Sequence, residues 1–215
     1  MSPSFITELG LPGIRQVPYG LHACQLYSDA QQLVAALVPF FSTGLKRNEL
    51  CLWTVSDRMC AEKAHQALTK EWPDSSREIL TGRLRILDYA RFDGDAGMNG
   101  SEMVQVWLDE ERRALLGGYE GLRIAGEVPN LSDGKQWGAF MDYERQVTAA
   151  FADRRIVSLC NYHRPRYSDV HAAEILRAHH CVLRRAEDTW EVLSSQGAYL
   201  NSGNAQSSAI CPMKP

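Results

Sequence analysis

Strand-like and helix-like segments alternate along most of this chain, and this alternation limits the fold more than any other feature. Short apolar segments typical of buried strands precede longer segments with apolar residues at helical spacing. This order predicts a doubly wound α/β fold, with a mainly parallel sheet of about six strands and helices on both faces. The expected strands are 21–27, 49–55, 83–89, 121–127, 155–162 and 181–185, and the expected helices are 28–45, 58–71, 101–116, 132–151 and 168–178.

The chain length favours one domain. With 215 residues and 45% hydrophobic content, the chain can bury one good-sized core. We expect a flexible lead at 1–17, a single domain at 18–186, and a C-terminal helix followed by a mobile tail at 187–215. Residues 197–215 have many small polar side chains and little periodicity, which is typical of a mobile segment.

Charge and cysteine usage exclude several classes of protein. The net charge of −3 comes with scattered lysines and arginines, which argues against direct nucleic-acid binding. Neither a membrane-spanning apolar run nor a secretory leader is evident, so we expect a cytoplasmic protein. The six cysteines lie mostly in apolar segments and are expected to be reduced, and neither CxxC nor HExxH occurs.

Two helix starts and one buried helical face can be proposed from residue types. Ser28 with Gln31 fits a capping box for the first helix, and Ser132 fits an N-cap for the helix near 132–151. One stripe of the latter helix carries a glutamate among apolar residues, namely Trp137, Met141, Glu144, Val147 and Phe151.

In an open α/β sheet, ligands bind beyond the carboxyl ends of the strands. The first strand-to-helix loop reads "YSDAQQ" and contains neither glycine nor lysine. Phosphate binding of the P-loop kind needs glycines whose backbone N–H groups surround the phosphate and a lysine that neutralises it. The loop therefore argues against a nucleotide site of that kind.

Six motifs in order resemble one family. They are "HACQLY" (22–27), "PFFSTGLKRNELCLW" (39–53), "GYEGLRIAGEV" (118–128), "DYE" (142–144), "LCNYHRPRY" (159–167) and "LRAHH" (176–180). Their order and spacing resemble the MEDS domain, named for methanogens, methylotrophs and the dichloromethane-responsive repressor DcmR. The resemblance implies a sensor of small organic molecules, notably simple hydrocarbon derivatives, in bacterial signal transduction or transcription control.

MEDS domains in turn resemble RecA-like ATPases of the circadian-clock, KaiC-like type. The resemblance implies a RecA-like or Rossmann-like three-layer scaffold that has lost its P-loop. "GLRIAGEV" resembles the strand that in an ATPase ends beside the metal and the attacking water, so Glu127 is left as an acid without a phosphate cradle.

A small organic ligand is expected at the carboxyl edge, between the loops after Tyr27, Gly126 and Cys160. Arg123, inside a strand, needs a buried partner, for which Glu127 and Glu144 are both candidates. The predicted ligand-binding residues are His22, Tyr27, Arg123, Glu127, Tyr162 and His163.

Metal ligands and cofactors are not predicted, although histidine and cysteine are abundant. The candidate metal ligands, each of which also has a plain packing explanation, are His22, Cys24, Cys160, His163, His179, His180 and Cys181. The chain is expected to be non-enzymatic and to signal through a histidine kinase or transcription regulator, with a homodimer left open. The alternatives are a protein interaction module without a small ligand and a metal- or haem-dependent sensor.

Overall fold

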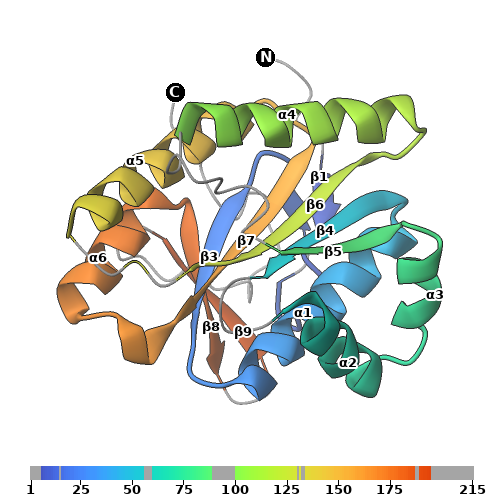
Figure 1. Ribbon diagram of the computed structural model, residues 1–215, viewed down its shortest axis with the longest axis horizontal. Helices are drawn as coiled ribbons and strands as arrows, with labels where there is room; N and C mark the ends of the chain where they lie inside the picture. The colour runs from blue at the N-terminus through green and yellow to red at the C-terminus, as the bar shows by residue number, and fades with distance from the viewer. Residues whose placement is uncertain are drawn as a thin grey trace.

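A seven-stranded sheet forms the centre of the computed structural model, which describes residues 6–14, 16–55, 60–88, 100–129, 131, 134–186 and 189–194 (Figure 1). All neighbouring strands are parallel except the last pair, which is antiparallel. The prediction of a mainly parallel sheet is confirmed. In sheet order the strands are β5 (Leu84–Asp88), β4 (Glu49–Val55), β6 (Gly121–Glu127), β7 (Ile156–His163), β3 (His22–Tyr27), β8 (Cys181–Ala186) and β9 (Thr189–Ser194).

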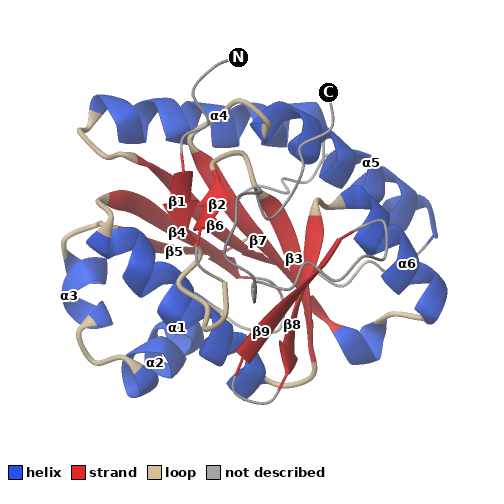
Figure 2. Ribbon diagram, turned by 180° about the vertical axis from the view of Figure 1, so that it is seen from behind, coloured by secondary structure: helices blue, strands red, loops and turns tan. Residues whose placement is uncertain are grey.

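Helices cover both faces of the sheet, as expected (Figures 1 and 2). One face packs against α1 (Ala30–Lys46), α2 (Ala61–Glu71) and α3 (Ser75–Leu80). The other packs against α4 (Gly100–Leu116), α5 (Gly134–Phe151) and α6 (Asp169–Ala178). Because strand side chains alternate between faces, the sheet separates two apolar cores. The short helix α3 was not predicted, since six residues give too little periodicity to detect.

The start of α1 differs in detail from the prediction. Asp29, not Ser28, is the N-cap, and its carboxylate accepts a hydrogen bond from the Gln32 N–H at 2.9 Å. Pro39 lies inside this helix. The expected N-cap at Ser132 falls outside the described residues.

In the N-terminal lead, which we expected to be flexible, residues 6–14 and 16–17 are described and include strand structure. Strands β1 (Ile6–Glu8) and β2 (Gln16–Pro18) pair antiparallel, and Leu9, Leu11 and Val17 are buried in the core that contains α1. The apolar residues of the lead are too widely spaced to show a strand period, and both their burial and hydrogen bonds from Arg123 and Arg47 hold the lead against the domain.

The chain after 186 also differs from expectation. A strand, β9, replaces the predicted helix, and its Trp190 N–H donates to the Pro12 carbonyl at 2.8 Å. Trp190 and Val192 are buried in the same core as the N-terminal lead. The predicted mobile tail at 197–215 lies outside the described residues. Within the described part of the chain, no helix combines the length and apolar character needed to cross a bilayer.

Candidate functional site

A cavity of about 40 Å³ lies between the sheet and the layer formed by α4 and α5. Its sheet side includes Ile124, Gly126 and Ser158, and its helix side is largely aromatic and aliphatic. By volume it has room for roughly three water-sized groups. The complete lining is His22, Thr54, Trp107, Ile124, Gly126, Glu127, Val128, Pro129, Phe140, Tyr143, Glu144, Val147, Phe151, Ser158 and Cys160.

The cavity overlaps only in part with the crevice expected at the carboxyl edge. Glu127 and His22 line it, but the predicted walls Tyr27 and Tyr162 do not. The reason is that α5 packs across one face of the sheet, so the enclosed space lies beneath that helix and reaches the edge only at Glu127–Pro129.

Glu127 is the acidic group at the edge of this cavity. Its side chain is buried, and Oε1 accepts a hydrogen bond from the Tyr27 hydroxyl at 2.6 Å. Its Oε2 is buried and has no hydrogen-bond partner among the described residues. Buried polar atoms are nearly always paired, so this oxygen is available to a hydrogen-bond donor that reaches the edge of the cavity, beside Tyr27 of the α1-face core.

Arg123 does not join this site. Its side chain belongs to the opposite face of the sheet, where its Nε donates to Glu49 Oε2 at 2.5 Å. The expected pairings with Glu127 or Glu144 are therefore wrong. A one-residue step along a strand moves a side chain to the other face, which separates Arg123 from Ile124 and Gly126 in the cavity wall.

Tyr162 and His163 end on different partners. The Tyr162 hydroxyl donates to Glu144 Oε1 at 2.8 Å, and this tyrosine is fully buried. His163 Nε2 lies 3.1 Å from the Ser28 carbonyl, and its ring packs beside Tyr27. Tyr162 therefore positions Glu144, whereas His163 bridges the loops after β7 and β3.

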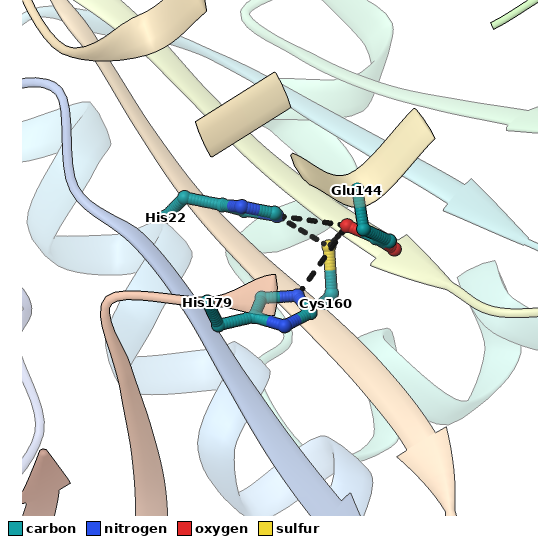
Figure 3. Close-up of side chains that lie close together, drawn as sticks. All are labelled: His22, Glu144, Cys160 and His179. Carbon is teal, nitrogen blue, oxygen red and sulfur yellow. Dashed lines mark hydrogen bonds and ion pairs between the residues drawn. The ribbon is translucent and has the colours of Figure 1, made fainter. Parts of the chain in front are cut away.

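The structure brings four potential metal ligands together, which we call the histidine cluster: His22, Glu144, Cys160 and His179 (Figure 3). They come from β3, α5, β7 and the end of α6, and their ligand atoms all lie within 4.8 Å of one another. His22 and Cys160 were among the residues considered from sequence, as was His179. Glu144 was not considered as a ligand, although a carboxylate within an apolar helical stripe was the available signal.

The buried cluster shifts the pKa values of its members in opposite directions. Burial and the charge of His179 lower the pKa of His22 to about 4, against the effect of Glu144. Burial opposes charge on His179, but the Cys24 sulfur and the Glu144 carboxylate raise the pKa of His179 well above its usual range. Burial would raise the pKa of Glu144, but the charge of His179 and the close approach of both histidine Nε2 atoms to Oε2 hold this pKa below its ordinary value. Burial and the negative Glu144 raise the pKa of Cys160 to about 12.

A family model for MEDS, the methanogen/methylotroph, DcmR sensory domain, matches residues 21–180. The chain belongs to the MEDS family. The match spans β3 to the end of α6, and thus contains the whole cavity lining and the histidine cluster. Membership in a family of sensory domains assigns this MEDS chain a sensory role.

A solved structure supports the RecA-like scaffold. The crystal structure of a KaiC-like protein from the hyperthermophilic archaeon Pyrococcus horikoshii OT3 matches with a TM-score of 0.56 and 12% identity, over 88% of this chain and 87% of that chain. Identity this low shows the fold alone. No curated protein sequence matches this MEDS chain at a significant level.

Proposed function

We propose that this MEDS domain senses a compact organic molecule bound in the cavity beneath α4 and α5, and that it signals through a partner protein without catalysing a reaction. The observation that carries the proposal is the mostly apolar cavity, at whose edge the buried Glu127 has one carboxylate oxygen, Oε2, without a partner among the described residues. Ligand sites typically combine apolar walls with a few polar anchors of this kind.

The cavity volume limits the size of the ligand. Space for roughly three water-sized groups suits a molecule of about one to three carbons. Because Glu127 offers an acceptor, short alcohols and amines fit better than halocarbons, which carry no donor. This size range agrees with the simple hydrocarbon derivatives that the family resemblance implies.

The expected affinity is weak. The best small ligands gain at most about 1.5 kcal/mol per heavy atom, so three atoms give about 4.5 kcal/mol and a Kd in the millimolar range. A ligand screen at micromolar concentration would miss such a molecule.

Signalling is proposed to pass through α5. This helix contributes Phe140, Tyr143, Glu144 and Val147 to the cavity wall, so an occupant contacts it along two turns. Packed interiors transmit small displacements because they leave few voids. A histidine kinase or transcription regulator that docks on α5 would read this change.

Isothermal titration with short alcohols, amines and halocarbons at millimolar concentration tests the proposal. Glu127→Gln should weaken binding of the best ligand by about 1–3 kcal/mol, the range for losing a buried charged partner. Gly126→Ala adds a methyl group to the cavity, where its Cβ would meet only Thr54 Oγ1, at 3.4 Å, and it should also reduce binding.

Gly138→Ala is the matched control, because a Cβ at Gly138 meets nothing within 4 Å and the residue does not line the cavity. The proposal fails if no compound binds the wild-type chain, or if Gly126→Ala and Gly138→Ala bind equally well. The interaction-module function would then be the better explanation.

A further inference from the structure

Hydrogen bonds outside the histidine cluster orient its ligand atoms toward one centre. His22 is the first example. Its Nδ1 lies 2.7 Å from Thr148 Oγ1, and the Thr148 hydroxyl itself donates to the Ala178 carbonyl at 2.5 Å. Because that hydroxyl has used its proton, it accepts from the Nδ1–H of His22. Neutral His22 therefore presents the lone pair of Nε2 to the cluster.

His179 is also oriented by a hydrogen bond at Nδ1 that leaves Nε2 directed toward the cluster. Its Nδ1 lies 2.7 Å from the Ile175 carbonyl, which can only accept a hydrogen bond. The Nε2 of His179 is buried, lies 3.4 Å from Glu144 Oε2, and forms no hydrogen bond among the described residues. A second histidine is thus oriented toward the same point with its outer nitrogen anchored on the backbone.

The carboxylate is oriented in the same way. Tyr162 donates to Oε1 of Glu144, which leaves Oε2 to face the two histidines and Cys160. Neutral His22 and ionised Glu144 then set two acceptor atoms 3.1 Å apart. Two facing acceptors repel unless a proton or a cation lies between them.

Four of the six separations between ligand atoms are close to those of a tetrahedral metal site, and the other two are within 4.8 Å. Metal bonds of about 2.0–2.3 Å place the ligand atoms roughly 3.3–3.6 Å apart. Here His22 Nε2 lies 3.2 Å from Cys160 Sγ, Cys160 Sγ lies 3.7 Å from Glu144 Oε2, and His179 Nε2 lies 3.4 Å from the same oxygen. A small movement of each side chain would admit an ion.

We propose that His22, Glu144, Cys160 and His179 bind a divalent transition-metal ion of the zinc type. Two imidazoles, one thiolate and one carboxylate suit Zn²⁺ and disfavour Mg²⁺ and Ca²⁺, which prefer oxygen ligands. The two anionic ligands balance the charge of the ion, so the buried site becomes neutral. Four protein ligands make it a closed site without a free position for catalysis.

The cluster also has the supporting contacts that metal sites need. Thr148, the Ile175 carbonyl and Tyr162 each hold the outer atom of one ligand. A haem does not fit, because the adjoining cavity of about 40 Å³ is far smaller than a macrocycle. The proposal goes beyond the sensing of an organic molecule and stands without it, although three of the four ligand residues also line that cavity.

Metal analysis and cobalt titration of the full chain test the site. Protein purified without chelators from zinc-supplemented cultures should contain one zinc per chain by mass spectrometry. The metal-free chain titrated with Co²⁺ should show a sulfur-to-cobalt charge-transfer band and the visible bands of tetrahedral cobalt. Thr148→Val should weaken zinc binding by about 10–100-fold, the usual effect of removing a supporting hydrogen bond.

Cys160→Ser should lose the sulfur-to-cobalt band, whereas Cys51→Ser should keep it. Cys51 is a matched control, because it is a buried strand cysteine in the core on the opposite face of the sheet. If Cys160→Ser does not fold, the wild-type chain decides: zinc should block alkylation of Cys160 and leave the exposed Cys60 reactive. A wild-type chain that takes up neither zinc nor cobalt, or a sulfur band that survives Cys160→Ser, would overturn the proposal and leave a metal-free ion pair.

Discussion

Each face of the sheet buries a set of charged side chains, and the two sets differ in how completely their polar atoms are hydrogen-bonded. On the α1 face, Arg123 pairs with Glu49, and its other guanidinium nitrogens reach the carbonyls of Leu9 and Glu8. Glu49 Oε1 in turn accepts from Thr7 and Tyr19 at 2.5 and 2.7 Å. On the α5 face, the histidine cluster leaves His179 Nε2 without a hydrogen bond among the described residues.

The Arg123–Glu49 pair has all its partners within the protein, whereas the histidine cluster is the proposed metal site. The pair of Arg123 and Glu49 is closed, with the guanidinium also stacked 4.6 Å from the centre of the Phe40 ring, and it ties the N-terminal lead to the sheet. Burial and the negative Glu49 raise the pKa of Tyr19, which keeps its hydroxyl protonated as a donor. The histidine cluster borders a cavity, and its His179 Nε2 has no hydrogen bond among the described residues, which supports the metal site proposed above.

The largest expected effect is on the closed pair. Glu49→Gln leaves the Arg123 charge buried without its counter-charge, and the free energy of unfolding should fall by about 3–5 kcal/mol. Urea unfolding measures it. Glu8→Gln is the control, because Glu8 pairs with Arg47 at the surface, where such a pair contributes about 1 kcal/mol or less. Equal losses for the two variants would contradict a structural role for the buried pair.

Tyr162→Phe should have the next largest effect, on the histidine cluster. It removes the hydroxyl that donates to Glu144, and losing a hydrogen bond to a charged group costs about 1.5–3 kcal/mol. Tyr27→Phe removes a comparable hydroxyl from Glu127. Both variants should unfold at lower urea concentration than the wild-type chain. Only Tyr162→Phe should alter the visible spectrum of the cobalt-loaded chain. A changed spectrum in Tyr27→Phe would mean that the two carboxylates act as one site.

Gly44→Ala should lower the free energy of unfolding by a smaller amount. It tests how tightly Arg123 is held beside Glu49. A Cβ on Gly44 would lie 2.4 Å from Arg123 Nε, so the guanidinium must shift away from Glu49. Such overpacking costs about 1–3 kcal/mol.

Gly138→Ala makes the same change in α5, in open space, and should instead stabilise the fold by about 0.5–1 kcal/mol. Thermal unfolding of both variants provides the comparison. A stable Gly44→Ala variant would show that Arg123 has room to move.

Much of the scaffold was predictable because its signals are local. Strands β4 and β6 begin and end at the predicted residues, since each is a compact apolar segment between polar turns. The N-terminal lead, β9 and α3 were missed because each is short and depends on packing with distant residues. For example, Trp190 is held by a hydrogen bond to Pro12, a contact that periodicity does not reveal.

The sequence by itself determined the α/β class, the missing phosphate loop and the family resemblance, because these depend on residue type, order and spacing. Only the tertiary structure decided which side chains meet. Parallel pairing sets His22 opposite Ser158, and α5 then lays Glu144 over that part of the sheet beside Cys160. Strand register and helix docking arise from the packing of the whole core. The same local pattern was therefore compatible with pairing Arg123 to Glu144, whereas the fold sends those two side chains to opposite faces.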